Sequence, residues 1–120
     1  MADRGAREVL VHYAVAAENL FDYIDRMQGH VETPTRAGHC TDVTRAARDG
    51  QGFFRVDNPW MQSRWDGFVE AAGQAGAHCT RAIMDLDDEA LRIGLSEIQT
   101  QHRVVGCLHA RLRGSTDGTC

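Results

Sequence analysis

The sequence contains no lysine, and all 13 of its basic residues are arginine. No lysine is therefore available as a Schiff-base nucleophile or as a general base, which excludes a group of covalent mechanisms. The 17 acidic residues outnumber the basic ones and give a formal net charge of −4. Because the chain also has no cluster of basic residues that could hold a phosphate backbone, we expect no nucleic-acid partner.

Long hydrophobic runs are also missing. The longest uninterrupted apolar stretches contain only a few residues, whereas a membrane-spanning helix needs about 20. The opening residues, MADRGAREVL, carry charges where a secretory signal needs an apolar segment. We therefore expect neither membrane insertion nor export, and we predict a cytoplasmic protein whose four cysteines are reduced thiols.

Catalytic and nucleotide-binding motifs are absent as well. The chain has no GxSxG, GxxxxGK[ST], GxGxxG or HExxH pattern, and no CxxCH for covalent haem attachment. Asp85, Asp87, Asp88 and Glu89 do bring carboxylates together, but acidic side chains at the start of a helix are explained by the helix dipole. We therefore predict a protein that is not an enzyme.

What the sequence does have is a spacing of apolar residues that alternates between three and four, which is typical of amphipathic helices. In the first segment we expect Asp3 to cap the helix and Gly29 to end it. Its predicted buried face consists of Leu10, Tyr13, Ala17, Leu20, Ile24 and Met27. The same spacing recurs in two later segments.

A second, shorter helix is predicted over residues 34–48, because Thr33 and Pro34 suit a helix start and Asp49-Gly50 suits an end. Its apolar face is thin, so this helix either packs closely through small side chains or lies at the edge of a bundle. The predicted face consists of Ala37, Cys40, Val43, Ala46 and Ala47. Residues 50–59 are expected to be irregular, since Gly50, Gly52 and Asn58-Pro59 disfavour regular structure.

The third helix begins near Pro59 and presents Met61, Trp65, Phe68, Ala72, Ala75, Cys79 and Ala82 on one face. Gly67, Gly73 and Gly76 interrupt this run, and each costs roughly 1 kcal/mol relative to alanine in an exposed helix interior. Either the helix breaks near Gly73–Gly76, or the glycines let a neighbouring helix approach closely. We expect a continuous helix.

The fourth helix carries acidic residues at its start and Arg111 and Arg113 at its end, which complements the helix dipole. Its predicted face consists of Leu91, Leu95, Ile98, His102, Val105, Leu108 or His109, and Leu112. Together these segments predict an all-α fold, an antiparallel bundle of about four helices. We assign residues 1–114 to a single domain and 115–120 to a polar, disordered tail.

Two sets of residues are candidates for function. Cysteine and histidine on the inner faces could bind zinc or haem between facing helices. This set consists of Cys40, Cys79, His102 and His109. The spacing is not that of a common metal motif, and structural roles for these residues are the simpler interpretation.

The second set is an aromatic cluster within 16 residues, of the types that dominate protein interfaces. It consists of Phe53, Phe54, Trp60, Met61 and Trp65, with Phe68 close by. The cluster either closes the end of the bundle or binds a protein. The chain has only 32 large hydrophobic side chains from which to build a core, which is few for a monomer of 120 residues. We therefore predict a non-catalytic regulatory or adaptor protein that binds another protein and forms a homodimer, with a metal- or haem-binding bundle as the alternative.

Overall fold

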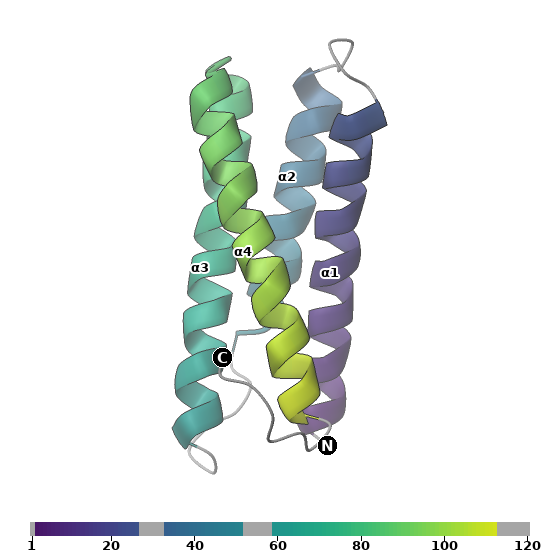
Figure 1. Cartoon of the computed structure of the whole chain (residues 1–120), viewed down its shortest axis with the longest axis vertical. Helices are drawn as coiled ribbons and strands as arrows, with labels where there is room; N and C mark the ends of the chain where they lie inside the picture. The colour runs from purple at the N-terminus through teal and green to yellow at the C-terminus, as the bar shows by residue number, and fades with distance from the viewer. Residues whose placement is uncertain (1, 27–32, 52–58, 113–120) are drawn as a thin grey trace.

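The computed structural model describes residues 2–26, 33–51 and 59–112. Four helices account for nearly all of these residues: α1 (Ala2–Arg26), α2 (Thr33–Arg48), α3 (Pro59–Met84) and α4 (Asp88–Leu112). They run alternately up and down, as Figure 1 shows. Each helix packs against the ones before and after it in the chain, and α4 closes the bundle by packing against α1. The predicted all-α bundle is confirmed.

The apolar positions predicted from spacing do form the core. Every predicted residue of the α3 face is buried, and so are Leu10, Tyr13, Ala17 and Leu20 of α1. At the centre, the rings of Tyr13 and Phe68 pack nearly perpendicular to each other, with 5.2 Å between their centroids, and this contact joins two helices that are diagonal in the bundle. The phenol of Tyr13 makes no hydrogen bond within the part of the chain described, and its burial raises its pKa well above the ordinary value.

Some predicted boundaries were wrong. The helix α1 begins at Ala2, so position 3 lies inside the helix and not at the N-cap where it was predicted. The start of α4 is capped by Asp87, whose carboxylate accepts a hydrogen bond from the backbone N–H of Ala90 at 3.0 Å. The predicted helix end at Gly29, the irregular segment around Phe53 and Phe54, and the tail at 115–120 lie outside the described residues.

The helix α3 is continuous through Gly73 and Gly76, as expected. Of these two glycines, only Gly76 lies against another helix. A Cβ atom at Gly76 would stand 2.9 Å from the backbone nitrogen of Thr44 in α2, whereas one at Gly73 would meet nothing within 4 Å. The thin apolar face of α2 therefore packs closely against α3. The small side chains of α2 allow this approach, and so does Gly76 in α3.

The turn from α3 to α4 ends α3 in a Schellman motif. The N–H of Asp87 bonds to the carbonyl of Ala82, and the N–H of Leu86 bonds to that of Ile83. Leu86 adopts a left-handed backbone conformation, with φ of 55°, at a position where glycine is usual. Leu86 is 79% exposed, and Met84, two residues earlier, is also exposed. None of the described helices is both long and apolar enough to cross a membrane.

Candidate protein-binding surface

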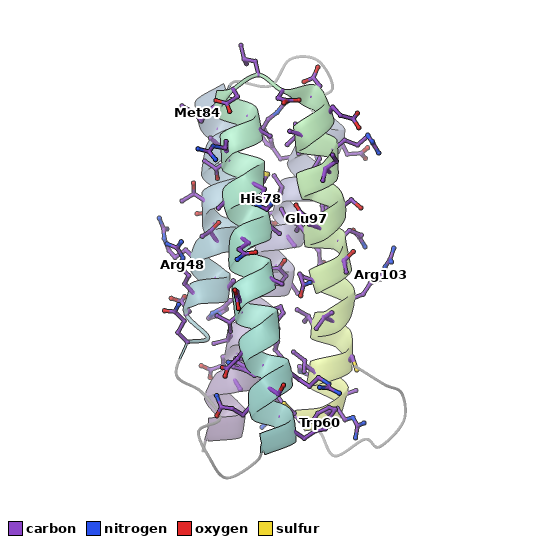
Figure 2. All side chains as sticks on the ribbon, turned by 90° about the vertical axis from the view of Figure 1, so that its left-hand side faces the viewer. Arg48, Trp60, His78, Met84, Glu97 and Arg103 are labelled. Carbon is purple, nitrogen blue, oxygen red and sulfur yellow. A yellow bond between two sulfur atoms is a disulfide. The ribbon has the colours of Figure 1, made fainter. Side chains whose placement is uncertain are left out.

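Trp60 lies in the first turn of α3, at the end of the bundle opposite Met84 (Figure 2). Trp65 is fully buried, whereas Trp60 is 36% exposed. Helix geometry explains this difference, because five residues correspond to about 500° of rotation, or 140° between the two side chains. The two tryptophans therefore belong to two different surfaces, the core and the base of the bundle.

Two arginines flank the indole of Trp60. The guanidinium carbon of Arg64, one turn further along α3, lies 4.9 Å from the ring centroid, and that of Arg111, in the last turn of α4, lies 4.5 Å from it. A guanidinium over an indole is attracted to the negative face of the ring, by about 0.5–1 kcal/mol at an exposed site. Trp60, Arg64 and Arg111 are called the basal cluster below.

The basal cluster combines the two residue types that contribute most to the energy of protein interfaces, tryptophan and arginine. Stacking holds the indole in place without hiding it, so little conformational freedom remains to be lost when a partner binds. The arginines keep their positive charge at every physiological pH. The cluster therefore fits a partner surface that carries carboxylates and an apolar group.

The other members of the predicted aromatic set do not lie on this surface. Met61 and Trp65 are buried in the core. The indole N–H of Trp65 donates a hydrogen bond to the carbonyl of Gly50 at 2.6 Å, which ties α3 to the end of α2. Phe53 and Phe54 lie outside the described residues. Among the described residues, Trp60 is therefore the one member of the predicted aromatic set that remains a candidate for the interface, and Arg64 and Arg111 are added to it.

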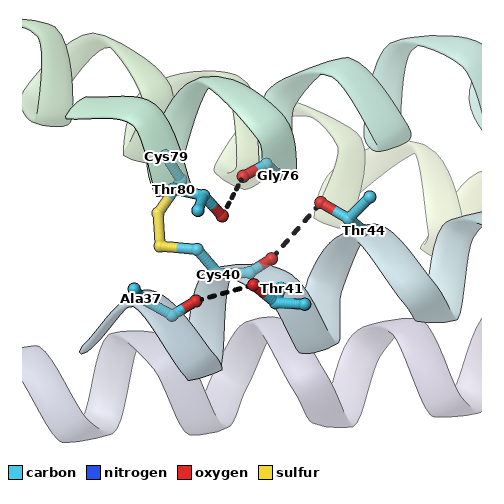
Figure 3. The surroundings of a disulfide bond; sticks show 7 residues. All are labelled: Ala37, Cys40, Thr41, Thr44, Gly76, Cys79 and Thr80. Atoms are coloured by element: carbon cyan, nitrogen blue, oxygen red, sulfur yellow. Dashed lines mark hydrogen bonds between the residues drawn. A yellow bond between two sulfur atoms is a disulfide. The ribbon is translucent and has the colours of Figure 1, made fainter. Parts of the chain in front are cut away.

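The prediction of reduced cysteines is wrong for the residues that the structure describes. Cys40 of α2 and Cys79 of α3 form a disulfide, with their Cα atoms 5.6 Å apart and both residues fully buried (Figure 3). Cys107 is also disulfide-bonded. The thiol prediction rested on the absence of an export signal, and it took no account of the close approach of α2 and α3, which brings these two side chains together.

The same disulfide removes the basis of the predicted metal site. A metal is bound by thiolates, and the sulfur atoms of Cys40 and Cys79 are instead bonded to each other. The Nε2 atom of His102 lies 3.2 Å from a carboxylate oxygen of Glu18. Within the described part of the chain, no group of three or more histidine, cysteine, aspartate or glutamate side chains is arranged to hold a metal ion.

A second polar pair crosses between α3 and α4. Nδ1 of His78 and Oε1 of Glu97 are 3.0 Å apart, and Figure 2 shows the two residues facing each other across neighbouring helices. They line a hollow of about 260 Å³ that extends to Asp85 and Asp87 in the turn between α3 and α4. Both side chains are about half exposed, so we interpret the pair as a surface contact between helices.

An exposed apolar stripe on α1 was not singled out from the sequence. Val11 and Val15 are 48% and 50% exposed, although both lie in the middle of a helix. A hollow of about 300 Å³ between α1 and α4 is lined by Val11 and by Ala14, the residue before Val15. In the sequence, Val11 and Val15 are an apolar pair four residues apart that lies outside the predicted core face, and this spacing indicates a second apolar stripe on the helix.

Comparison of the chain with protein-family models, with curated proteins and with solved structures finds no match. The functional interpretation of the surfaces therefore rests on their chemistry alone.

Proposed function

We propose that this protein is a small regulatory or adaptor protein that acts by binding another protein, as an anti-activator or an inhibitor does, and that it catalyses no reaction. The observation that carries the proposal is the basal cluster, an exposed indole with two guanidinium groups within 5 Å of its ring centroid. We further propose that the protein is a homodimer. Its net charge of −4 argues against a nucleic-acid partner.

The partner that fits the basal cluster is a protein surface with a carboxylate beside an apolar side chain. Arg64 is exposed, so it can offer its N–H groups to an acidic residue, and the uncovered part of the indole can bury apolar area. No specific observation favours the alternative of a zinc- or haem-binding bundle. The cytoplasmic location stays a prediction, and the buried disulfide argues for an oxidising compartment.

Replacing Trp60 by alanine is expected to abolish partner binding while the bundle stays folded. The loss of two cation–π contacts costs about 1 kcal/mol of unfolding free energy, because Trp60 is not one of the buried core residues. Met84→Ala is the matched control, since Met84 is an exposed apolar residue at the opposite end of the same helix. Thermal unfolding followed by circular dichroism measures the stability of each variant.

Binding is measured by placing a photo-cross-linking amino acid at position 60 or at position 84 in cells that naturally contain the chain. We expect a covalent adduct with a second protein from position 60, with the partner residues near the adduct rich in carboxylates, and none from position 84. The proposal is contradicted if position 60 yields no protein adduct, or if both positions capture the same proteins to the same extent. A loss of 3 kcal/mol or more for Trp60→Ala would make Trp60 a core residue and equally contradict it.

A further inference from the structure

The exposed apolar stripe on α1 has opposite charges at its two ends, so a second copy in the antiparallel direction would place each charge against an opposite one. At about 100° per residue, Arg7, Val11, Ala14, Val15 and Glu18 fall within about 100° of one another on the helix surface. Along this stripe the order is a positive charge, then three small apolar side chains, then a negative charge. Within this stripe Arg7 therefore lies on one side of the apolar centre and Glu18 on the other, and Glu8 lies beside Arg7 at the border of the stripe.

A second copy placed antiparallel on this stripe would bring the two apolar centres together and place opposite charges at both ends. Val11 of one copy would lie opposite Val15 of the other, and Arg7 would lie opposite Glu18, on both sides of a twofold axis. Such a pairing closes on itself, so it forms a dimer and not a filament. A parallel pairing would instead oppose like charges, Arg7 against Arg7 and Glu18 against Glu18.

The neighbouring helix leaves room for this contact. The hollow of about 300 Å³ between α1 and α4 is lined by Val11 and Ala14 on one side and by Val105, Gly106 and Ala110 on the other. A Cβ atom at Gly106 would meet nothing within 4 Å, so α4 is open at this point. Figure 1 shows why: α4 leans from beside α3 at one end of the bundle toward α1 at the other.

We infer that a second copy of this chain binds this surface, with the two α1 helices antiparallel and the α4 residues around Gly106 at the edge of the contact. The inference rests on the proposed homodimer and adds its surface and its orientation. It explains why two valines in the middle of a helix stay half exposed in the single chain. The basal cluster lies at the end of α3 and α4, outside this stripe, so the dimer leaves it available to a different protein.

Charge reversal tests the orientation. Arg7→Glu and Glu18→Arg are each expected to raise the dimer dissociation constant at least about tenfold, because one substitution in a twofold interface changes two ion pairs. The double variant with both reversals is expected to return to within about threefold of the wild type. Glu18→Arg also removes the contact with His102 inside the chain, and the double variant does not restore that contact, so recovery identifies the pairing between copies.

A steric variant gives an independent test. Gly106→Gln places a long polar side chain where the single chain has open space, and glutamine favours helix over glycine. This variant is therefore expected to keep or raise its melting temperature while the dimer weakens at least about tenfold. Sedimentation velocity over a concentration series measures association for every variant, and circular dichroism confirms the fold.

The outcomes separate the two proposals. If the wild type is a dimer and Arg7→Glu, Glu18→Arg and Gly106→Gln leave its dissociation constant unchanged, the α1 surface is overturned and the proposed homodimer remains. A dimer weakened by both single reversals and not recovered by the double reversal overturns the antiparallel orientation. A wild type that is monomeric at hundreds of micromolar overturns the homodimer and the α1 surface together, and leaves the basal cluster to be tested by cross-linking.

Discussion

Removing the disulfide between Cys40 and Cys79 is expected to lower the free energy of unfolding by about 4 kcal/mol. The two cysteines are 39 residues apart in the sequence, and closing a loop of that size restricts the unfolded chain by about this amount. The double variant Cys40→Ala/Cys79→Ala isolates this bond, because a reducing agent would also break the disulfide of Cys107. A loss of 4 kcal/mol is a large part of the 5–15 kcal/mol that stabilises a typical domain.

Urea denaturation of the wild type and the double variant measures this change. Along with the lower midpoint, we expect a steeper dependence on urea for the variant, because its unfolded chain is less restricted and exposes more surface. Alkylation of the denatured, unreduced protein followed by mass spectrometry reports the bond directly. A stability change below 1 kcal/mol, or free thiols at positions 40 and 79, would show that the bundle does not depend on this bond.

Substituting alanine at two neighbouring glycines of α3 is expected to shift stability in opposite directions. Gly76→Ala should destabilise by about 3 kcal/mol, at the upper end for overpacking, because the added methyl group meets the backbone of Thr44 as well as its hydroxyl oxygen, and the backbone cannot rotate away as a side chain can. Gly73→Ala should stabilise by about 0.5–1 kcal/mol, because its methyl group enters open space and alanine favours the helix.

The two glycine variants control for each other, since both lie in the middle of α3, three residues apart. Helix propensity alone predicts that both substitutions stabilise the protein, and only the close approach of α2 reverses the sign at position 76. Chemical denaturation of both variants in parallel measures the sign of the stability change at each position. Equal stabilisation by both substitutions would mean that α2 and α3 are further apart in solution than the structure places them.

These glycines also show how far the sequence predicts the fold. The spacing of apolar residues predicted the core face of α3 correctly and favoured a continuous helix, because that information lies within the helix itself. It could not say which glycine permits a close approach, since this depends on Thr44 of another helix. The bond between Cys40 and Cys79 was missed for the same reason, because their separation in the sequence carries no information on pairing.

The candidate surface was predictable only in part. The angle between Trp60 and Trp65 follows from helix geometry, and it separates a surface tryptophan from a core tryptophan correctly. Arg64 could have been identified as a neighbour of Trp60, because residues four apart share a helix face. Arg111 could not, since it belongs to α4 and reaches the indole only through the packing of the bundle. Met61 and Trp65 entered the predicted interface set although the same spacing had placed them in the core.

The molar mass of the wild-type chain in solution shows whether this bundle binds a second copy of itself, which is the first of the protein-binding surfaces proposed for it. Light scattering at tens of micromolar chain, under conditions that preserve the disulfides, is the measurement. We expect a mass of twice 13.3 kDa, with a fall toward the single-chain value on dilution. A mass of 13.3 kDa that does not change with concentration would contradict it.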